Sequence, residues 1–360
     1  MATEPSAEAS QRAVENLAAK LRRRQIVGSR ETALETVLVL RQVISKARFS
    51  NIDQLVETIR SVGRKLVDAQ PKEYTVGNTV RKVDDGPPTS KPTFSIAKFV
   101  SQGQPRKQAT PQKISHEARG TLKENNPDDP DAFARTLKPV LMEAIQDVFD
   151  ELETVYDNIS KNAKDHIHSD EIILTIGKSN TVAAFLKSAA PYRKYTVIVA
   201  ETAPSNSGHE MAEILSSAGI STVLVPDSSI YALMSRINKV ILGAHAILAN
   251  GGMFAITGSL LAAAAARAHS TPVVVCAGQF KLTPQWNLYH EYGALDFGDP
   301  SSVLGFEEGD LVDKVDVINP FYDYVRPEMV DAYITNDGDH PPSSVYRLIK
   351  EAYDDEDYEL

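Results

Sequence analysis

The sequence predicts an α/β protein in which an N-terminal all-helical domain precedes a doubly wound, mainly parallel sheet domain. Over residues 7–69 the apolar residues recur at the spacing of amphipathic helices. From residue 171 onward, short runs rich in β-branched residues alternate with helical patterns. Continuous apolar strands separated by helices are typical of a parallel sheet covered on both faces.

Composition limits the classes of function. The chain has 360 residues, 42% hydrophobic and 24% charged, which is enough for two cores or for one large domain with an arm. Its formal net charge of -10 disfavours nucleic acid and anionic membranes as partners, because their phosphates would be repelled. Cys276 is the only cysteine, so no internal disulfide can form, and its apolar neighbours predict a buried thiol. No signal peptide and no membrane span is predicted, so we expect a cytoplasmic protein.

Three helices are expected in a helical arm at residues 1–69. Gly28-Ser29 and Ser50-Asn51 supply the joints between them. Residues 70–130 are rich in Pro, Gly, Ser and Lys, with Pro-containing breakers near both ends, and are interpreted as a mobile insertion. A long connecting helix is then expected within residues 131–170, with a length of roughly 45 Å at 1.5 Å per residue.

The sheet domain is expected at residues 171–353, followed by an acidic, solvated tail at 354–360. The predicted strands are residues 171–176, 196–200, 221–225, 239–242 and 273–277. The predicted helices are residues 179–190, 207–218, 230–237 and 256–268. In such a sheet, ligands meet the loops at the carboxyl ends of the strands. These loops are residues 177–180, 201–208, 226–228 and 243–258.

Single motifs give weak signals. Asn250-Gly251-Gly252 before a helix could let backbone amides approach a phosphate, but a plain tight turn is the favoured interpretation. Ser207-Gly208-His209 lacks the surroundings of a nucleophile elbow. His166 and His168 are only two residues apart with no second ligand cluster, so a capped helix end is favoured over a metal site.

Three short motifs resemble the methylthioribose-1-phosphate and ribose-bisphosphate isomerases. They are Leu174-Thr175-Ile176-Gly177, Glu201-Thr202-Ala203-Pro204 and Gly243-Ala244-His245. Members of that family carry Leu-Thr-His-Cys, Glu-Thr-Arg-Pro and Gly-Ala-Asp at these places. The resemblance implies an isomerase-like fold of Rossmann type.

This sequence differs from the isomerases at the positions that carry out their chemistry. The resemblance implies that a Cys and an Asp carry the proton transfers of an aldose–ketose isomerisation, while an Arg helps to hold the phosphate. The matching positions here are Gly177, His245 and Ala203. Glycine and alanine offer no side-chain proton or charge, so two of the three roles cannot be performed. Histidine titrates near neutrality, but one base without its partners is poor isomerase machinery.

Longer segments resemble the alpha, beta and delta regulatory subunits of eukaryotic translation initiation factor 2B, and they are most similar to the beta type. The matching segments are residues 173–177, 197–204, 208–212, 233–240, 270–277, 280–284 and 321–328. The resemblance implies a non-catalytic regulatory subunit of the complex that exchanges GDP for GTP on initiation factor 2. Such a subunit binds initiation factor 2 and senses phosphorylation of its alpha subunit.

The implied partners are the alpha, gamma, delta and epsilon subunits of initiation factor 2B, initiation factor 2, and a second copy of the assembly across a two-fold axis. No cofactor is implied. Two alternatives stay open: an active sugar-phosphate isomerase, and a degenerate pocket that binds a sugar phosphate or a nucleotide as an effector.

Eleven residues are candidates for a partner interface or a vestigial pocket, and none is assigned a catalytic or metal-binding role. They are Thr175, Gly177, Lys178, Ser179, Glu201, Pro204, His209, His245, Asn250, Gly251 and Gly258.

Overall fold

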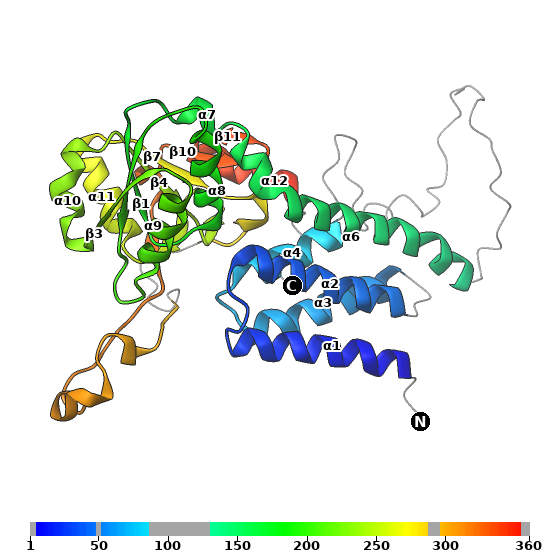
Figure 1. The fold of residues 1–360 in the computed structure, drawn as a ribbon. Helices are drawn as coiled ribbons and strands as arrows, with labels where there is room; N and C mark the ends of the chain where they lie inside the picture. The colour runs from blue at the N-terminus through cyan, green and yellow to red at the C-terminus, as the bar shows by residue number, and fades with distance from the viewer. Residues whose placement is uncertain (1–4, 48–51, 86–129, 287–295, 354–360) are drawn as a thin grey trace, which may run out of the picture. The chain divides into compact units, whose positions relative to one another are not determined.

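The computed structural model describes residues 5–47, 52–85, 130–286 and 296–353 (Figure 1). The chain divides into two compact units, one of residues 1–151 with 352–360 and one of residues 152–351. The boundary between the units falls inside a long helix. The predicted acidic tail, 354–360, lies outside the described residues.

The first unit is helical. Its helices are α1 (Pro5–Arg22), α2 (Ser29–Lys46), α3 (Ile52–Ala69), α4 (Tyr74–Asp85) and the first part of α6 (Pro130–Ser160). The core of α1 to α4 is aliphatic, with Leu17, Leu21 and Leu66 almost fully buried. Gly63 permits close contact between α3 and α4, since a Cβ there would lie 2.6 Å from Cγ1 of Val80.

The helix α4 corrects the predicted insertion, which began at residue 70. Val76, Val80 and Val83 recur at helical spacing and are buried, so this segment belongs to the helical core. This short pattern was outweighed by the composition of residues 70–130 as a whole, which are rich in Pro, Gly, Ser and Lys. The rest of the predicted insertion, 86–129, lies outside the described residues.

A long helix, α6, begins at Pro130 but ends ten residues before the predicted limit of 170. α6 has 31 residues, or about 46 Å at 1.5 Å per residue. It ends at Ser160, and the short helix α7 (Ala163–His166) follows. His166 pairs with Asp339 at 2.9 Å between Nε2 and Oδ2. The described residues contain no group of three or more His, Cys, Asp or Glu side chains that could hold a metal ion.

The second unit contains a seven-stranded sheet in the order β11-β10-β7-β4-β1-β2-β3, and the predicted fold class is confirmed. Its parallel strands are β1 (Ile172–Ile176), β2 (Thr196–Ala200), β3 (Ser221–Val225), β4 (Lys239–Gly243), β7 (Val273–Cys276) and β10 (Ala332–Thr335). Only β11 (Gly338–His340) pairs antiparallel in this sheet, with β10. Cys276 is buried, and burial raises the pKa of its thiol.

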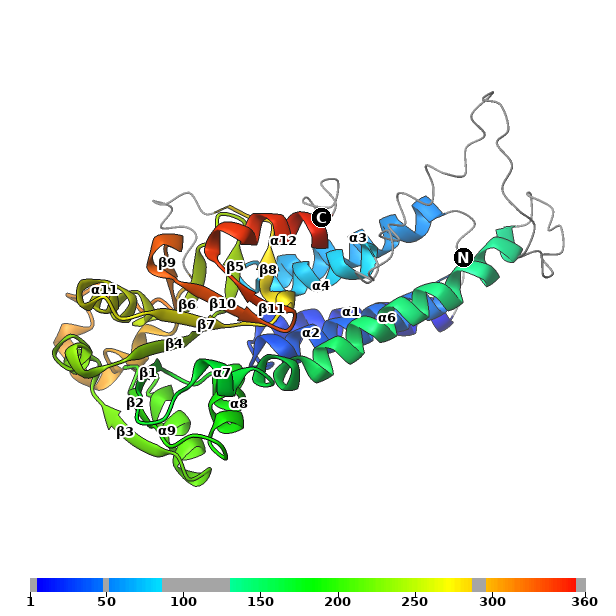
Figure 2. The same ribbon diagram turned by 90° about the horizontal axis from the view of Figure 1, so that it is seen from above.

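Helices cover both faces of this sheet. Figure 2 shows α8 and α9 on one face and α11 and α12 on the other. The helices of this unit are α8 (Asn180–Ala189), α9 (Ser207–Ser217), α10 (Ile230–Leu233), α11 (Ser259–His269) and α12 (Val345–Ala352). The shorter 3-10 turns are Asp227–Ser229, Met234–Arg236, Gln279–Lys281, Pro300–Ser302, Phe306–Leu311, Pro327–Met329 and Pro342–Ser344. Among the described residues, no helix has the length and apolar character needed to cross a membrane.

A second, four-stranded sheet was not predicted. Its order is β8-β5-β6-β9, from β8 (Leu282–Thr283), β5 (Ala246–Leu248), β6 (Met253–Ile256) and β9 (Tyr322–Val325). The helix predicted at 256–268 therefore begins later, at Ser259, because Ile256 ends β6. The helix predicted at 230–237 is a four-residue α-helix followed by a 3-10 turn.

A substitution in the core of the second unit should lower the free energy of unfolding, whereas one on its surface should not. Phe185 of α8 is fully buried, whereas Lys187 on the same helix is exposed. Phe185→Ala should lower the free energy of unfolding by about 3–5 kcal/mol, because it removes apolar contacts and leaves a cavity. Lys187→Ala should stay within about 0.5 kcal/mol of the wild type. Urea denaturation followed by fluorescence measures both, and equal effects would contradict the packing described.

Candidate functional site

The carboxyl ends of strands from both sheets meet around Gly177. A Cβ built on this glycine would lie 2.8 Å from Cδ1 of Ile256, 3.0 Å from Oγ of Ser207 and 3.3 Å from Oγ1 of Thr202. Gly177 has a φ of +58°, a conformation that favours glycine. The residues at the ends of β1 and β6 and in the loop after β2 therefore come together here, and neighbouring side chains crowd the position that a side chain on residue 177 would take.

The loop from Glu201 to Gly208 is held by its own chain. The carboxylate of Asp227 accepts hydrogen bonds from the backbone N–H of Thr202 at 2.9 Å and of Ala203 at 2.7 Å. Gly208 lies directly against the β2 carbonyl of Ala200, since a Cβ there would be 2.0 Å from that oxygen. Pro204, joined to Ala203 by a cis peptide bond, is exposed. Asp227 thus takes up two amide donors at the position where the isomerase-like motif would meet a ligand.

The candidates on the β1–α8 loop have structural roles. Thr175 is buried within β1. Ser179 caps α8 by accepting from the N–H of Val182 at 3.4 Å. Lys178 pairs with Glu210 of α9, at 2.6 Å between Nζ and Oε2, and both side chains are partly exposed. His209, next to Glu210 in α9, is exposed.

His245 lies under an aromatic ring. Only 8% of it is exposed, and its imidazole stacks on Tyr322 of β9 with ring centroids 4.0 Å apart and planes 12° apart. The neighbouring Lys281 is also buried and donates from Nζ to the carbonyl oxygen of Ala244 at 2.6 Å. The stack therefore limits the access of solvent to His245. Sequence reasoning did not find Tyr322 or Lys281 as parts of this site.

Asn250 and Gly251 form a tight turn between β5 and β6. The side chain of Asn250 donates to the hydroxyl of Tyr324 at 2.7 Å and accepts from the N–H of Gly252 at 3.0 Å. The N–H of Gly251 donates to the carbonyl of Leu248. Both glycine amides are thus bonded within the chain, which favours the turn over a phosphate-binding loop.

The N-terminus of α11 is occupied by a carboxylate of the chain. Oδ2 of Asp323 accepts from the N–H of Gly258 at 2.8 Å and from the N–H of Leu260 at 3.1 Å. A helix N-terminus favours a negative group there, and Asp323 supplies it. Burial raises the pKa of Asp323, while these two hydrogen bonds act in the opposite direction. The anion position at this helix is therefore filled without a ligand.

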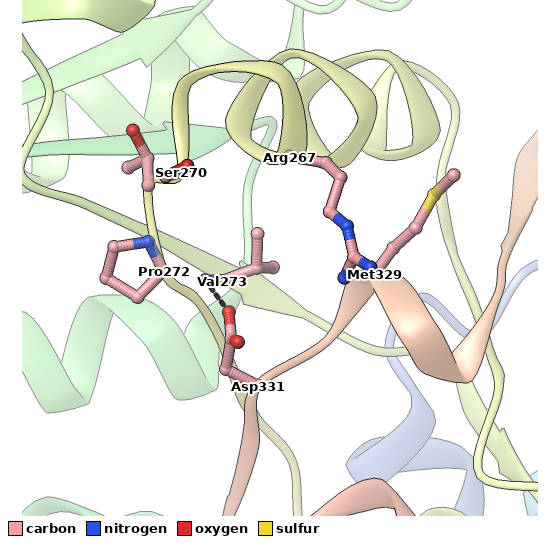
Figure 3. Close-up of a pocket in the computed structure, with 7 residues that line it drawn as sticks. Arg267, Ser270, Pro272, Val273, Met329 and Asp331 are labelled. Carbon is pink, nitrogen blue, oxygen red and sulfur yellow. Dashed lines mark hydrogen bonds between the residues drawn. The ribbon is translucent and has the colours of Figure 1, made fainter.

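A cavity of about 330 Å³ lies at the opposite, amino-terminal edge of the main sheet (Figure 3). Its lining residues are Arg267, Ser270, Thr271, Pro272, Val273, Met329 and Asp331. Asp331 accepts from the N–H of Val273 at 2.7 Å, and Arg267 donates to the carbonyl of Glu328. None of the eleven candidate residues lines this cavity.

The chain is similar over nearly its whole length to translation factor subunits. The family model of the initiation factor 2 subunit family matches residues 25–342. Translation initiation factor eIF2B subunit beta of Schizosaccharomyces pombe is 41% identical, over 96% of each chain. The tetrameric eIF2B-beta2-delta2 complex of Chaetomium thermophilum contains a chain that aligns with a TM-score of 0.70 and 25% identity, covering 98% of this chain and all of that one.

Isomerases are more distant relatives. Ribose 1,5-bisphosphate isomerase of Thermococcus kodakarensis is 24% identical, over 94% of each chain.

The effect of crowding at Gly177 on stability can be measured separately from the effect of its backbone conformation. Gly219 also has a positive φ, +79°, but nothing lies within 4 Å of its Cβ position. Gly219→Ala should destabilise the protein by about 1–2 kcal/mol through backbone strain alone. Gly177→Ala should cost about 1–3 kcal/mol more, because the added methyl group overpacks the junction. Chemical denaturation of both variants measures the difference, and equal losses would show that the junction can relax.

The raised pKa of Asp323 predicts a pH dependence of stability. A carboxyl group whose pKa rises on folding stabilises the fold most below its unfolded pKa, and this contribution is lost as pH rises through the folded value. The free energy of unfolding of the wild type, minus that of Asp323→Asn, should therefore fall as pH increases from 3.8 through the raised pKa. Urea denaturation at several pH values between about 3.5 and 6.5 measures this difference.

Asp299 is the matched control for that experiment. The backbone N–H of Ser301 lowers the pKa of Asp299, so the corresponding difference for Asp299→Asn should rise with pH. A difference for Asp323→Asn that also rises would mean that the carboxylate is better stabilised in the folded protein than in the unfolded chain.

Proposed function

Because the chain belongs to the initiation factor 2 subunit family, we propose that it is a non-catalytic, beta-type regulatory subunit of the guanine nucleotide exchange factor for translation initiation factor 2. The observation that carries this proposal is the 41% identity to a beta subunit over 96% of both chains. A match of this extent includes the helical unit as well as the α/β unit. It therefore favours the complete role of a beta-type subunit over the reuse of one domain.

The proposed role requires partner proteins. We assign to the chain the alpha, gamma, delta and epsilon subunits of initiation factor 2B, initiation factor 2 itself, and a second copy of the assembly across a two-fold axis. The beta2-delta2 assembly of the similar Chaetomium thermophilum protein supports the delta-type partner most directly. Within the assembly, the chain would help to sense phosphorylation of the alpha subunit of initiation factor 2. This role places the protein in the cytoplasm.

The absence of isomerase activity is part of the proposal. At Gly177 the left-handed backbone, and the side chains that crowd it, disfavour the cysteine that the isomerases carry there. Ala203 offers no charge to a phosphate. His245 could act as a base, but its stack on Tyr322 leaves it 8% exposed.

The phosphate position also argues against turnover. A sugar phosphate bound at the N-terminus of α11 would have to displace the carboxylate of Asp323 from two amide donors. Were Asp323 to remain ionised beside the ligand, its charge would repel the phosphate. The same argument weighs against a sugar-phosphate effector at this edge of the sheet.

Assembly with a delta-type subunit tests the proposal. The full-length chain, co-expressed with the delta-type subunit of the same organism, should form a stable complex with the mass of two copies of each. Size-exclusion chromatography with light scattering measures that mass. A chain that remains monomeric beside a folded delta-type subunit would contradict the proposed role.

Activity assays test the other part of the proposal, the absence of isomerase activity. Purified protein supplied with ribose 1,5-bisphosphate or methylthioribose 1-phosphate should give no ketose above the background of an unrelated protein prepared in the same way. Product formation that depends on the amount of this protein would show that it is an isomerase. Circular dichroism of the same sample excludes an unfolded preparation as the cause of a negative result.

A further inference from the structure

An arm projects from the α/β unit between β8 and β9. It comprises residues 296–321 and is the orange segment that extends away from the two sheets in Figure 1. No residue of the arm, 296–321, is buried. The arm is therefore a segment with defined turns but without a hydrophobic core of its own.

Hydrogen bonds fix the base of the arm. Phe297 and Pro320 form an antiparallel bridge. Beside this bridge, the N–H of Gly298 donates to the carbonyl of Asn319 at 2.7 Å. The hydroxyl of Thr257, which follows β6, donates to the carbonyl of Pro320 at 2.7 Å. The two chain segments at the base of the arm are thus hydrogen-bonded to each other and to the residue that follows β6 of the second sheet.

The tip of the arm, residues 300–318, is shaped by turns. The side-chain amide of Asn319 donates to the carbonyl of Asp299 and to the hydroxyl of Ser302. Asp299 also caps the first 3-10 turn by accepting from the N–H of Ser301. A second 3-10 turn, Phe306–Leu311, follows. These contacts give the first part of the tip a defined backbone conformation without a partner, which lowers the entropy lost on binding.

The tip presents apolar side chains to solvent. Phe306 is 82% exposed and Ile318 is 61% exposed, far more than a folded chain usually leaves for such side chains in one short segment. The exposed apolar residues of the tip are Val303, Phe306, Leu311, Val315 and Ile318. Burial of such surface is favourable, and the arm has no core in which to bury it. Another molecule must cover these side chains if they are to be buried.

Charge restricts what that molecule can be. The tip carries five carboxylates against the single ammonium group of Lys314. The acidic residues are Glu307, Glu308, Asp310, Asp313 and Asp316. Nucleic acid and anionic lipid would be repelled. A second copy of this chain is also unfavourable, because each copy carries a formal net charge of -10. The complementary surface is an apolar hollow rimmed by Lys and Arg on a different protein.

We infer that the tip of the arm, residues 300–318, docks into an apolar, basic-rimmed hollow on the delta-type subunit. This inference rests on the proposed function, since the delta-type subunit is the partner to which the similar beta2-delta2 assembly points. Phe306 would be the central anchor, because large aromatic side chains at the centre of an interface contribute most to affinity. The surrounding carboxylates would speed association and select the partner.

Binding of the full chain to the purified delta-type subunit, measured by biolayer interferometry at two salt concentrations, tests the inference. Phe306→Ala should weaken the affinity at least tenfold, mainly through faster dissociation. Glu308→Lys should slow association and reduce its dependence on salt. Two controls match these changes at exposed positions of the same unit: Tyr192→Ala for the lost aromatic ring, and Asp157→Lys for the reversed charge. Both controls should bind like the wild type.

The outcomes separate the two proposals. Failure of the wild-type chain to bind the delta-type subunit contradicts the proposed function itself. Wild-type binding that is unchanged in Phe306→Ala and Glu308→Lys overturns the inference while leaving the proposed function intact. If Phe306→Ala abolishes binding but Glu308→Lys has no effect, the hollow on the delta-type subunit does not have a basic rim, and that part of the inference is wrong. Self-association of the wild type that disappears in Phe306→Ala would make a second copy the occupant, and would also overturn the inference.

Discussion

Backbone amides at the carboxyl edge of the parallel sheet must find hydrogen-bond acceptors, and in this protein the chain supplies them. Parallel strands that lead into helices bring helix N-termini and tight turns to one edge, where several N–H groups have no partner within their own element. Asp227 accepts from two of these groups after β2. Asp323 accepts from two more at the start of α11. The two carboxylates therefore hold the junction together without a bound anion.

Because the chain's own carboxylates accept from the backbone amides at this edge, those amides are not free to bind a ligand. A site that binds an anion keeps donors or cations unsatisfied until the ligand arrives, and such sites often reduce stability. Here the equivalent donors are used, side chains crowd Gly177, and Tyr322 covers His245. The contacts that stabilise the junction therefore also occupy hydrogen-bond donors and space at this edge of the sheet.

The sequence predicted the elements whose signals are local. Strands β1 to β4 and β7 lie within one residue of their predicted ends, because runs such as residues 196–200 are continuous, apolar and bounded by turn residues. The second sheet was missed because its strands have two to four residues, too few to show a period. Helix α4 was missed because its short pattern of three buried valines lies in a region, residues 70–130, whose composition as a whole favours loops.

The site was predicted only in part, for a related reason. Its loops were expected at the correct edge of the sheet, since topology alone brings strand ends together. Asp323, in contrast, lies 65 residues after Gly258, and no local pattern links a carboxylate to an amide so far away in the chain.

The arm shows how this fold can separate stability from recognition. Its shape comes from hydrogen bonds at its base and in its turns, so its exposed apolar side chains contribute little to folding. Side chains that do not pack in the core can change with little effect on the α/β unit. Residues at the closed edge cannot, because Gly177, Gly208 and Asp323 each contact backbone or core atoms. Specificity for a partner can therefore vary at the arm while the junction of the two sheets remains the same.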